Sequence, residues 1–189
     1  MSGAPSTLSI SSGTISGTPI NANVGAHTIV VTATDGSSAA VSDTFILTVT
    51  NTNDAPTVTS AIADASTAED AAYSISISSV FTDVDSGDSC TYSMSGAPST
   101  ITLSGTTISG TPVNANVGTH TIVVTCTDGS SAAVSDTYVL TVTNTNDAPT
   151  VANAIADAST AEDAAYSISI SSVFADVDVG DTLTYSISG

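Results

Sequence analysis

Acidic side chains are the residues of this 189-residue chain that could do chemistry. The chain contains 18 Asp and Glu residues, two His and no Lys or Arg, so its formal charge is -18. Apart from the two histidines, no side chain can neutralise these carboxylates, and many of them are clustered, as in DVDSGD at 83–88. Their partners must therefore come from solution, and metal cations are the obvious candidates.

Two simpler interpretations compete with a cation site. The acids could keep a Ser/Thr-rich surface soluble, or the Asp and Asn residues could cap their own backbone in ordinary turns. The clustering favours the cation, because scattered acids would serve solubility equally well. An EF-hand is excluded, since Gly87 is the fifth residue of the DVDSGD loop, no Glu occupies the twelfth position and no helices flank it.

Composition excludes several classes of function. Without basic clusters the chain has no footprint for nucleic-acid phosphates or anionic lipids. No apolar run approaches the length of a membrane span, so we expect no direct membrane insertion. An enzyme is not expected either, because no spacing gathers Ser and Asp residues around His120. His27 and His120 occupy the same repeat position, where a packed or edge histidine is the better interpretation.

The elements that carry the acids repeat with a period of 93 residues. The segment TNTNDAPTV at 50–58 recurs at 143–151, and the same offset relates Met1 to Met94 and Gly96 to Gly189. Each segment ends an alternating apolar run with Asn, Asp and a proline that cannot donate to a sheet ladder. We call residues 50–58 the first joint and residues 143–151 the second joint.

The joints predict the domain organisation. Residues 57–149 form a complete repeat, residues 1–56 the C-terminal part of another, and residues 150–189 the N-terminal part of a third. The chain is either a window of a longer array, which we favour, or a subunit whose open halves are completed by neighbouring molecules through strand exchange. In both cases exposed half-cores and sheet edges predict head-to-tail association with neighbouring repeats or with copies of the chain.

Short alternating segments predict an all-β fold. Tyr73, Ile75 and Ile77 share one face of a strand with serines on the other face, and His120 to Cys126 alternate in the same way. No segment has a helical period. Each 93-residue repeat contains about seven short strands separated by turn residues, which is typical of an immunoglobulin-like β-sandwich.

The repeat resembles a known family. The resemblance rests on AEDAAYSISI at 68–77, FTDVDSGDSCTYS at 81–93, ISGTPVNANVGTHTIVVTCTDG at 108–129 and the NDAP sequences of the joints. The order and spacing of these pieces are similar to the cadherin-like domains of the dystroglycan type and to the closely related Putative Ig domain of bacterial surface proteins. The resemblance implies β-sandwiches strung in tandem, with calcium bound where one domain meets the next.

The resemblance also implies which residues bind Ca²⁺. In cadherin-like chains the oxygen ligands come from a Glu early in one domain, from the joint after it, and from a DxD loop and an xDxG turn in the next domain. The set implied at the first joint is Asn53, Asp54, Asp83, Asp85 and Asp128. The set implied at the second joint is Glu69, Asn146, Asp147, Asp176 and Asp178.

Three further acids have secondary places in this scheme. Asp88 and Asp181 could join through water or from outside the ligand shell, and Asp35 would serve a joint upstream of Met1. The joint TNTNDAP is shorter than the cadherin linker, and no D-R-E-like segment lies between Cys90 and Cys126. We therefore expect one or two ions at each joint rather than three.

The two cysteines occur only in the complete repeat. Cys90 and Cys126 align with Leu183 and Ala33 of the neighbouring repeats, and both are expected to face inward. This paired replacement suggests that the two side chains touch. A disulfide would fit an oxidising exterior and add about 3 to 4 kcal/mol. Two buried free thiols that act as small hydrophobic side chains remain the alternative.

Two classes of function remain. The first is a calcium-stabilised tandem-repeat stalk or fibre of a secreted or cell-surface, adhesin-like protein that assembles end to end. The second is a carbohydrate- or protein-binding β-sandwich module of a secreted protein. With no Trp and five Tyr, the chain offers a poor stacking platform for sugars. No residue pattern names a cell-surface or glycan ligand.

Overall fold

The computed structural model describes residues 1–189, which form short β-strands and two 3-10 helices but no α-helix. Residues 1–50 contain β1 (Leu8–Ser11), β2 (Thr14–Gly17), η1 (Asn21–Asn23), β3 (Gly25–Thr34) and β4 (Ala40–Val49). The first half of the complete repeat contains β5 (Thr57–Val58), β6 (Ala65–Ala68), β7 (Tyr73–Ser76), β8 (Phe81–Thr82) and β9 (Thr91–Ser95). Its second half contains β10 (Ile101–Ser104), β11 (Thr107–Gly110), η2 (Asn114–Asn116), β12 (Gly118–Thr127) and β13 (Ala133–Thr143). The last strands are β14 (Thr150–Val151) and β15 (Phe174–Ala175).

The chain forms two compact units, and each contains one joint. The first unit is made of residues 1–60, 80–92 and 125–135. The second unit is made of residues 61–79, 93–124 and 136–189. Neither 3-10 helix is long or apolar enough to cross a membrane.

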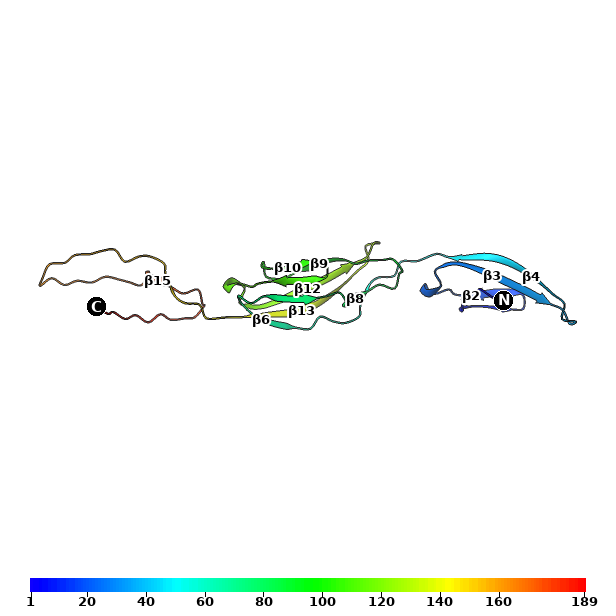
Figure 1. Ribbon diagram of the computed structural model, residues 1–189, viewed down its shortest axis with the longest axis horizontal. Helices are drawn as coiled ribbons and strands as arrows, with labels where there is room; N and C mark the ends of the chain where they lie inside the picture. The colour runs from blue at the N-terminus through cyan, green and yellow to red at the C-terminus, as the bar shows by residue number, and fades with distance from the viewer. The chain divides into compact units, whose positions relative to one another are not determined.

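The first unit is built on a long hairpin. Strands β3 and β4 pair antiparallel along ten residues each, from Gly25 opposite Val49 to Thr34 opposite Ala40 (Figure 1). Asp35 closes the turn between them, because its carboxylate accepts the backbone N–H groups of Ser37 and Ala39, each at 2.9 Å. Two further antiparallel pairs, β1 with β2 and β5 with β8, belong to the same unit.

The complete repeat is an immunoglobulin-like sandwich. One sheet has the strand order β10-β11-β7, and the other has the order β6-β13-β12-β9, in which β6 runs parallel to β13. Alternate side chains face the interior, so Ile108 of β11 and Ile122 of β12 are fully buried. Tyr73 of β7 and Tyr138 of β13 join the two sheets, with 3.5 Å between their hydroxyl oxygens. The all-β sandwich predicted from the alternation is confirmed.

The side chain of Asn116 stabilises the turn that contains the 3-10 helix η2. The Oδ1 atom of Asn116 accepts the Val113 N–H at 3.1 Å and the Thr100 hydroxyl at 2.9 Å. The backbone carbonyl of Asn116 lies 2.7 Å from Nε2 of His120. The same contacts recur 93 residues earlier around η1, where His27 Nε2 lies 2.6 Å from the carbonyl of Asn23. Both histidines therefore hold a turn in place.

Cys90 and Cys126 form a disulfide, with their Cα atoms 5.2 Å apart. Of the two alternatives left open by the sequence, the structure has the bridge and no free thiol. The bridge closes a loop with a sequence separation of 36. A loop of this size restricts the unfolded chain enough to add about 4 kcal/mol to stability in the chain-entropy description.

Replacing Cys90 by Leu and Cys126 by Ala tests this contribution. The double variant installs the pair that the neighbouring repeats carry, Leu183 and Ala33, so the site stays apolar and the repeat should fold. Urea unfolding followed by circular dichroism should show that a reducing agent lowers the midpoint of the wild-type protein by an amount equivalent to about 4 kcal/mol. The same agent should leave the double variant unchanged. An unchanged wild-type midpoint would show that the bridge adds nothing.

Candidate functional site

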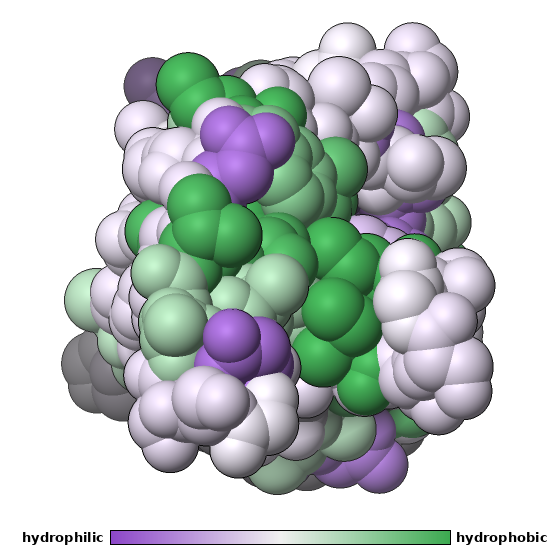
Figure 2. Space-filling view, turned by 90° about the vertical axis from the view of Figure 1, so that its right-hand side faces the viewer, coloured by the Kyte–Doolittle hydropathy of each residue, from purple (hydrophilic) through white to green (hydrophobic).

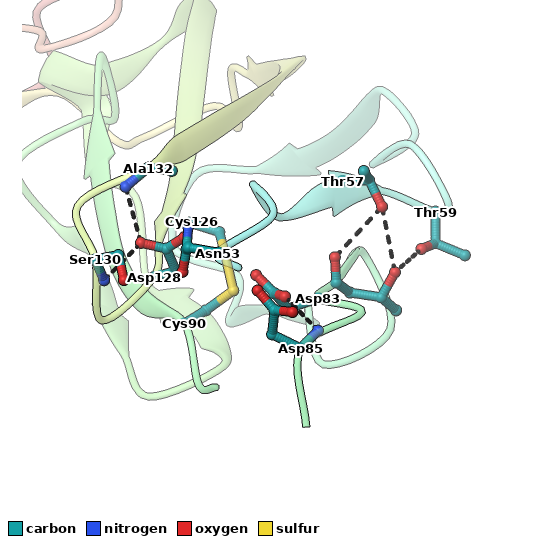
Figure 3. The surroundings of a disulfide bond; sticks show 11 residues. Asn53, Thr57, Thr59, Asp83, Asp85, Cys90, Cys126, Asp128, Ser130 and Ala132 are labelled. Carbon is teal, nitrogen blue, oxygen red and sulfur yellow. Dashed lines mark hydrogen bonds between the residues drawn. A yellow bond between two sulfur atoms is a disulfide. The ribbon is translucent and has the colours of Figure 1, made fainter. Parts of the chain in front are cut away.

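The acidic loop at 83–88 gathers three carboxylates in the first unit. Ligand oxygens of Asp83, Asp85 and Asp88 lie within 4.8 Å of one another. The backbone arranges them, because the Asp85 N–H donates to Oδ1 of Asp83 at 2.8 Å and the Asp88 N–H donates to the Asp85 carbonyl at 3.2 Å. Asp85 is only 4% exposed. Figure 3 shows the carboxylates of Asp83 and Asp85 side by side.

The first joint contacts this loop and a second acidic turn. The Asp54 N–H donates to Oδ2 of Asp85 at 2.7 Å, and Nδ2 of Asn53 donates to Oδ2 of Asp128 at 2.9 Å. The other oxygen of Asp128 accepts the N–H groups of Ser130 and Ala132 at 2.9 and 2.8 Å (Figure 3). The structure thus links the joint to both acidic elements of the set implied at 50–58.

The disulfide lies between the two acidic elements. Cys90 follows Asp88 by two residues, and Cys126 precedes Asp128 by two residues. The bridge therefore ties the end of the 83–88 loop to the start of the 128–132 turn, close to Asn53 and Asp85 (Figure 3). A covalent link at this place limits how far the two groups of carboxylates can separate.

The second joint forms an acidic cluster in the second unit. Ligand oxygens of Glu69, Asp147 and Asp178 lie within 4.8 Å of one another, and Asp178 belongs as well to a group with Asp176 and Asp181. The Asp147 N–H donates to Oδ2 of Asp178 at 2.7 Å, which repeats the contact seen at the first joint. The Asp178 N–H donates to Oδ1 of Asp176 at 2.9 Å.

Glu69 has the most unusual environment of these acids. Its side chain is only 2% exposed, and Oε1 accepts the N–H of Thr145, 76 residues away, at 2.8 Å. Its other oxygen, Oε2, is buried and has no hydrogen-bond partner. In the first unit, Oδ2 of Asp83 is likewise buried without a hydrogen-bond partner. A buried carboxylate oxygen without a partner is costly, and neighbouring carboxylates add repulsion to that cost. A divalent cation would relieve both, and the all-oxygen donor set fits Ca²⁺.

Two of the residues named from the sequence make only local contacts. Nδ2 of Asn146 donates to the backbone carbonyl of Asp147 at 2.8 Å and to no carboxylate. Asp35 is exposed, and its carboxylate serves only the β3–β4 turn. The remaining members of the two implied sets take part in the contacts or acidic groups described above.

The sequence interpretation missed Asn21 and Asn114. Nδ2 of Asn21, in η1, donates to Oδ1 of Asp85 at 2.7 Å and to Oδ2 of Asp54 at 3.1 Å. Asn114, in η2, donates to Oδ1 of Asp178 at 3.0 Å. The signal was the NAN sequence at the same position of both repeats, at 21–23 and 114–116. Each joint therefore receives an amide from the turn that precedes it in the chain.

Hydrogen bonds and crowding move the pKa values in opposite directions. The N–H of Asp54 and the amide of Asn21 lower the pKa of Asp85, and the amide of Asn53 lowers the pKa of Asp128. For Asp88, which stays exposed, partial desolvation and the charges of the neighbouring aspartates raise the pKa. The surroundings of the first joint thus favour the charged forms of Asp85 and Asp128 and disfavour the charged form of Asp88.

The chain belongs to the Putative Ig domain family, whose model matches residues 1–50 and 55–143. This family membership and the sandwich fold together make the chain a tandem Ig-like repeat protein, similar to the cadherin-like class predicted from the motifs.

Several bacterial adhesins contain a similar stretch. The serine-rich adhesin for platelets of Staphylococcus aureus strain MRSA252 is 39% identical over 148 residues, which cover 76% of this chain and 10% of the adhesin. The homologous adhesin of strain MW2 shows the same identity over 6% of its length. The chain therefore spans a small part of these relatives. The likeness to adhesins and the disulfide support the extracellular location predicted from the sequence.

Solved structures give more distant matches. The protocadherin gammaB7 EC3-6 structure aligns with a TM-score of 0.44 and 24% identity, covering 76% of this chain and 39% of the protocadherin. An endo-fucoidan hydrolase of glycoside hydrolase family 107 aligns with a TM-score of 0.43 and 20% identity, covering 75% of this chain and 22% of the hydrolase. Both scores are too low to bear on function.

Replacing Asn53 by Ala tests the electrostatics of the first joint. Without the amide donor, the pKa of Asp128 should rise toward its ordinary value of 3.8. A lowered pKa stabilises the folded state above the unfolded value and loses that stability as the pH falls through the folded pKa. In a chelator, wild-type stability should therefore fall more steeply below about pH 4 than that of the variant.

The matched control is Asn146→Ala, because Asn146 contacts only a backbone carbonyl and no carboxylate. Carbon-detected NMR titration of the aspartates should give the pKa of Asp128 directly. If Asn53→Ala and Asn146→Ala leave the pKa of Asp128 equally unchanged, the hydrogen bond from Asn53 is not its cause.

Proposed function

We propose that this chain is part of a calcium-stiffened array of Ig-like repeats in an adhesin-like protein of the cell surface or of a secreted assembly. In this proposal Ca²⁺ binds at each joint, where acids of consecutive repeats meet. The observation that carries the proposal is the buried, unpartnered Oε2 atom of Glu69 inside the cluster with Asp147 and Asp178. The chain has no Lys or Arg to compensate that cluster.

The donor set supports calcium over other cations. Every candidate ligand offers oxygen, either from a carboxylate or from an amide or backbone carbonyl, which suits a hard cation. Several side chains from distant parts of the sequence surround each joint, and Ca²⁺ accepts this irregular geometry more readily than Mg²⁺ does. When bound, the ion would supply positive charge that offsets the repulsion between the carboxylates.

The residues proposed to hold the ion follow the two joints. At the second joint they are Glu69, Asp147 and Asp178, with Asp176 and Asp181 adjacent. At the first joint they are Asp54, Asp83, Asp85 and Asp128, with Asn53 and Asp88 adjacent. Because Asp178 belongs to two overlapping acidic groups, we propose one or two ions at the second joint. Asn21 and Asn114 would orient the carboxylates through their amides.

The repeat boundaries are part of the proposal. We take residues 57–149 as one complete module, preceded by the C-terminal part of a module at 1–56 and followed by the N-terminal part of another at 150–189. An ion held by residues on both sides of a joint would fix the angle between consecutive modules. The array would then act as a stalk that holds a distant binding region away from the surface, in keeping with the likeness to bacterial adhesins.

Calcium should raise the thermal stability of the wild-type chain. A ligand that binds only the folded state adds about 2.7 kcal/mol at a free concentration about 100 times its Kd. Melting curves recorded by circular dichroism in EGTA, in Ca²⁺ and in Mg²⁺ would measure the effect, with the largest gain expected in Ca²⁺. Identical melting curves in EGTA and in millimolar Ca²⁺ would refute the proposal.

Glu69→Gln should separate calcium binding from stability. The variant removes one negative charge from the second joint, so we expect it to melt no lower than wild type in EGTA but to gain much less from Ca²⁺. Glu162→Gln, measured at low ionic strength where the copies stay separate, is the matched control, because Glu162 occupies the same repeat position but is exposed and belongs to no acidic cluster. Isothermal titration calorimetry should show fewer or weaker Ca²⁺ sites in Glu69→Gln and wild-type binding in Glu162→Gln. Equal loss in both variants would contradict the assignment.

A further inference from the structure

Residues 1–50 present an apolar groove that the chain leaves open. Leu8, Ile15, Phe45 and Leu47 line it together with Gly17 and its neighbours, and its volume is about 320 Å³. Phe45 is 42% exposed, although the equivalent residue of the complete repeat, Tyr138, is 1% exposed. Figure 2, viewed from the side on which β2, β3 and β4 lie in Figure 1, shows apolar side chains in green reaching the surface between paler polar ones.

The complete repeat shows what covers the equivalent surface. There β7 pairs antiparallel with β11, with Ile75 opposite Ile108 and Tyr73 opposite Gly110. Tyr73 is only 7% exposed, and its hydroxyl reaches that of Tyr138. The equivalents of Gly110 and Tyr138 are Gly17 and Phe45, which both belong to the open groove. The occupant of such a groove is therefore a tyrosine on a β7-like strand.

Residues 166–169 have the same sequence as β7 but pair with no other strand. Their sequence YSIS is identical to β7, and Tyr166 is 54% exposed. The apolar side chains of Ile168 and Tyr185 are exposed as well. A second apolar groove, lined by Ile170, Phe174, Leu183 and Tyr185, has a volume of about 270 Å³. The chain thus holds both halves of the interface that the complete repeat buries.

We propose that the open groove of residues 1–50 binds residues 150–189 of a second copy of this chain, in the register of the complete repeat. Ile15 then lies opposite Ile168 of the second copy, and the side chain of Tyr166 of the second copy fills the groove beside Phe45. The segment 158–161 of the second copy adds a parallel strand beside residues 47–50, as β6 does beside β13. Each added copy leaves one new groove open, so the contact generates a head-to-tail filament.

The filament contact involves residues 1–189 by themselves and gives a form to the head-to-tail association expected from the exposed half-cores. It does not depend on calcium binding. Because the chain carries a formal charge of -18, copies repel one another at low ionic strength, and screening by salt should favour association with or without Ca²⁺. An effect of salt alone separates this inference from the calcium proposal, which predicts a specific response to Ca²⁺.

A disulfide trap tests the register. In the complete repeat, Cys90 and Cys126 bridge the front and back halves of the sandwich, and their equivalents are Leu183 and Ala33. The double variant Ala33→Cys with Leu183→Cys should therefore form disulfides between successive copies under mild oxidation. A non-reducing gel should show a ladder that extends well beyond the dimer and collapses to monomer on reduction.

Three controls make the result decisive. Each single variant should stop at a dimer, and a mixture of the two singles, one labelled with ¹⁵N, should form mixed dimers as seen by mass spectrometry. Thr32→Cys with Leu183→Cys should give no ladder, because Thr32 points to the other face of β3, where its hydroxyl contacts Ser42 at 2.8 Å. A disulfide confined to single chains, two free thiols, or a ladder as strong from the Thr32 variant would overturn the proposal.

A second measurement needs no added cysteine. Sedimentation velocity of the wild-type chain in salt should show mass that increases with concentration. Tyr166→Ala should reduce this association about tenfold or more, since a buried aromatic side chain dominates such a contact. Val179→Ala, at an exposed loop position, should leave it unchanged. A wild-type chain that stays monomeric at all concentrations, or an equal effect of the two variants, would overturn the proposal.

Discussion

The structure depends on how carboxylates without cationic partners are kept close together. The chain has 18 acidic residues and no Lys or Arg, and it still places three of them within 4.8 Å of one another at the second joint. Backbone N–H groups and asparagine amides supply part of the compensation, as at Asp85 and Asp178. They leave Oε2 of Glu69 without a partner. The cation proposed for the joint would offset that remaining deficit.

Much of the fold could be predicted from the sequence because the repeat is regular. Alternation at Tyr73, Ile75 and Ile77 predicted the inward face of β7 and of the residue that follows it, and the joints marked where the sheet ladders stop. The contacts of the 3-10 turns could not be predicted in this way. Asn21 and Asn114 look like ordinary turn residues, and only the folded chain brings them to carboxylates 64 positions away. Local pattern does not encode such distances.

The candidate site, like the fold, could be predicted only in part from the sequence. The acidic loop at 83–88 and the joints were visible as clusters in the sequence, and the structure links them by hydrogen bonds. The burial of Glu69 was not visible, because its environment is made by Thr145 and by strands from other parts of the chain. The pairing of Cys90 with Cys126 stayed open at the level of sequence for the same reason. Spacing shows which residues are available, and packing decides which of them lose contact with water.

The disulfide makes the complete repeat mechanically unlike its neighbours. If the protein is pulled from its ends, the load passes from Cys90 to Cys126 through the sulfur atoms and bypasses the residues between them. At about 3.4 Å for each extended residue, roughly 120 Å of contour length is thereby withheld from stretching. The neighbouring repeats, with Leu183 and Ala33 at these positions, have no such limit. Under tension they would lengthen first, and the bridged repeat would keep its acidic loops close together.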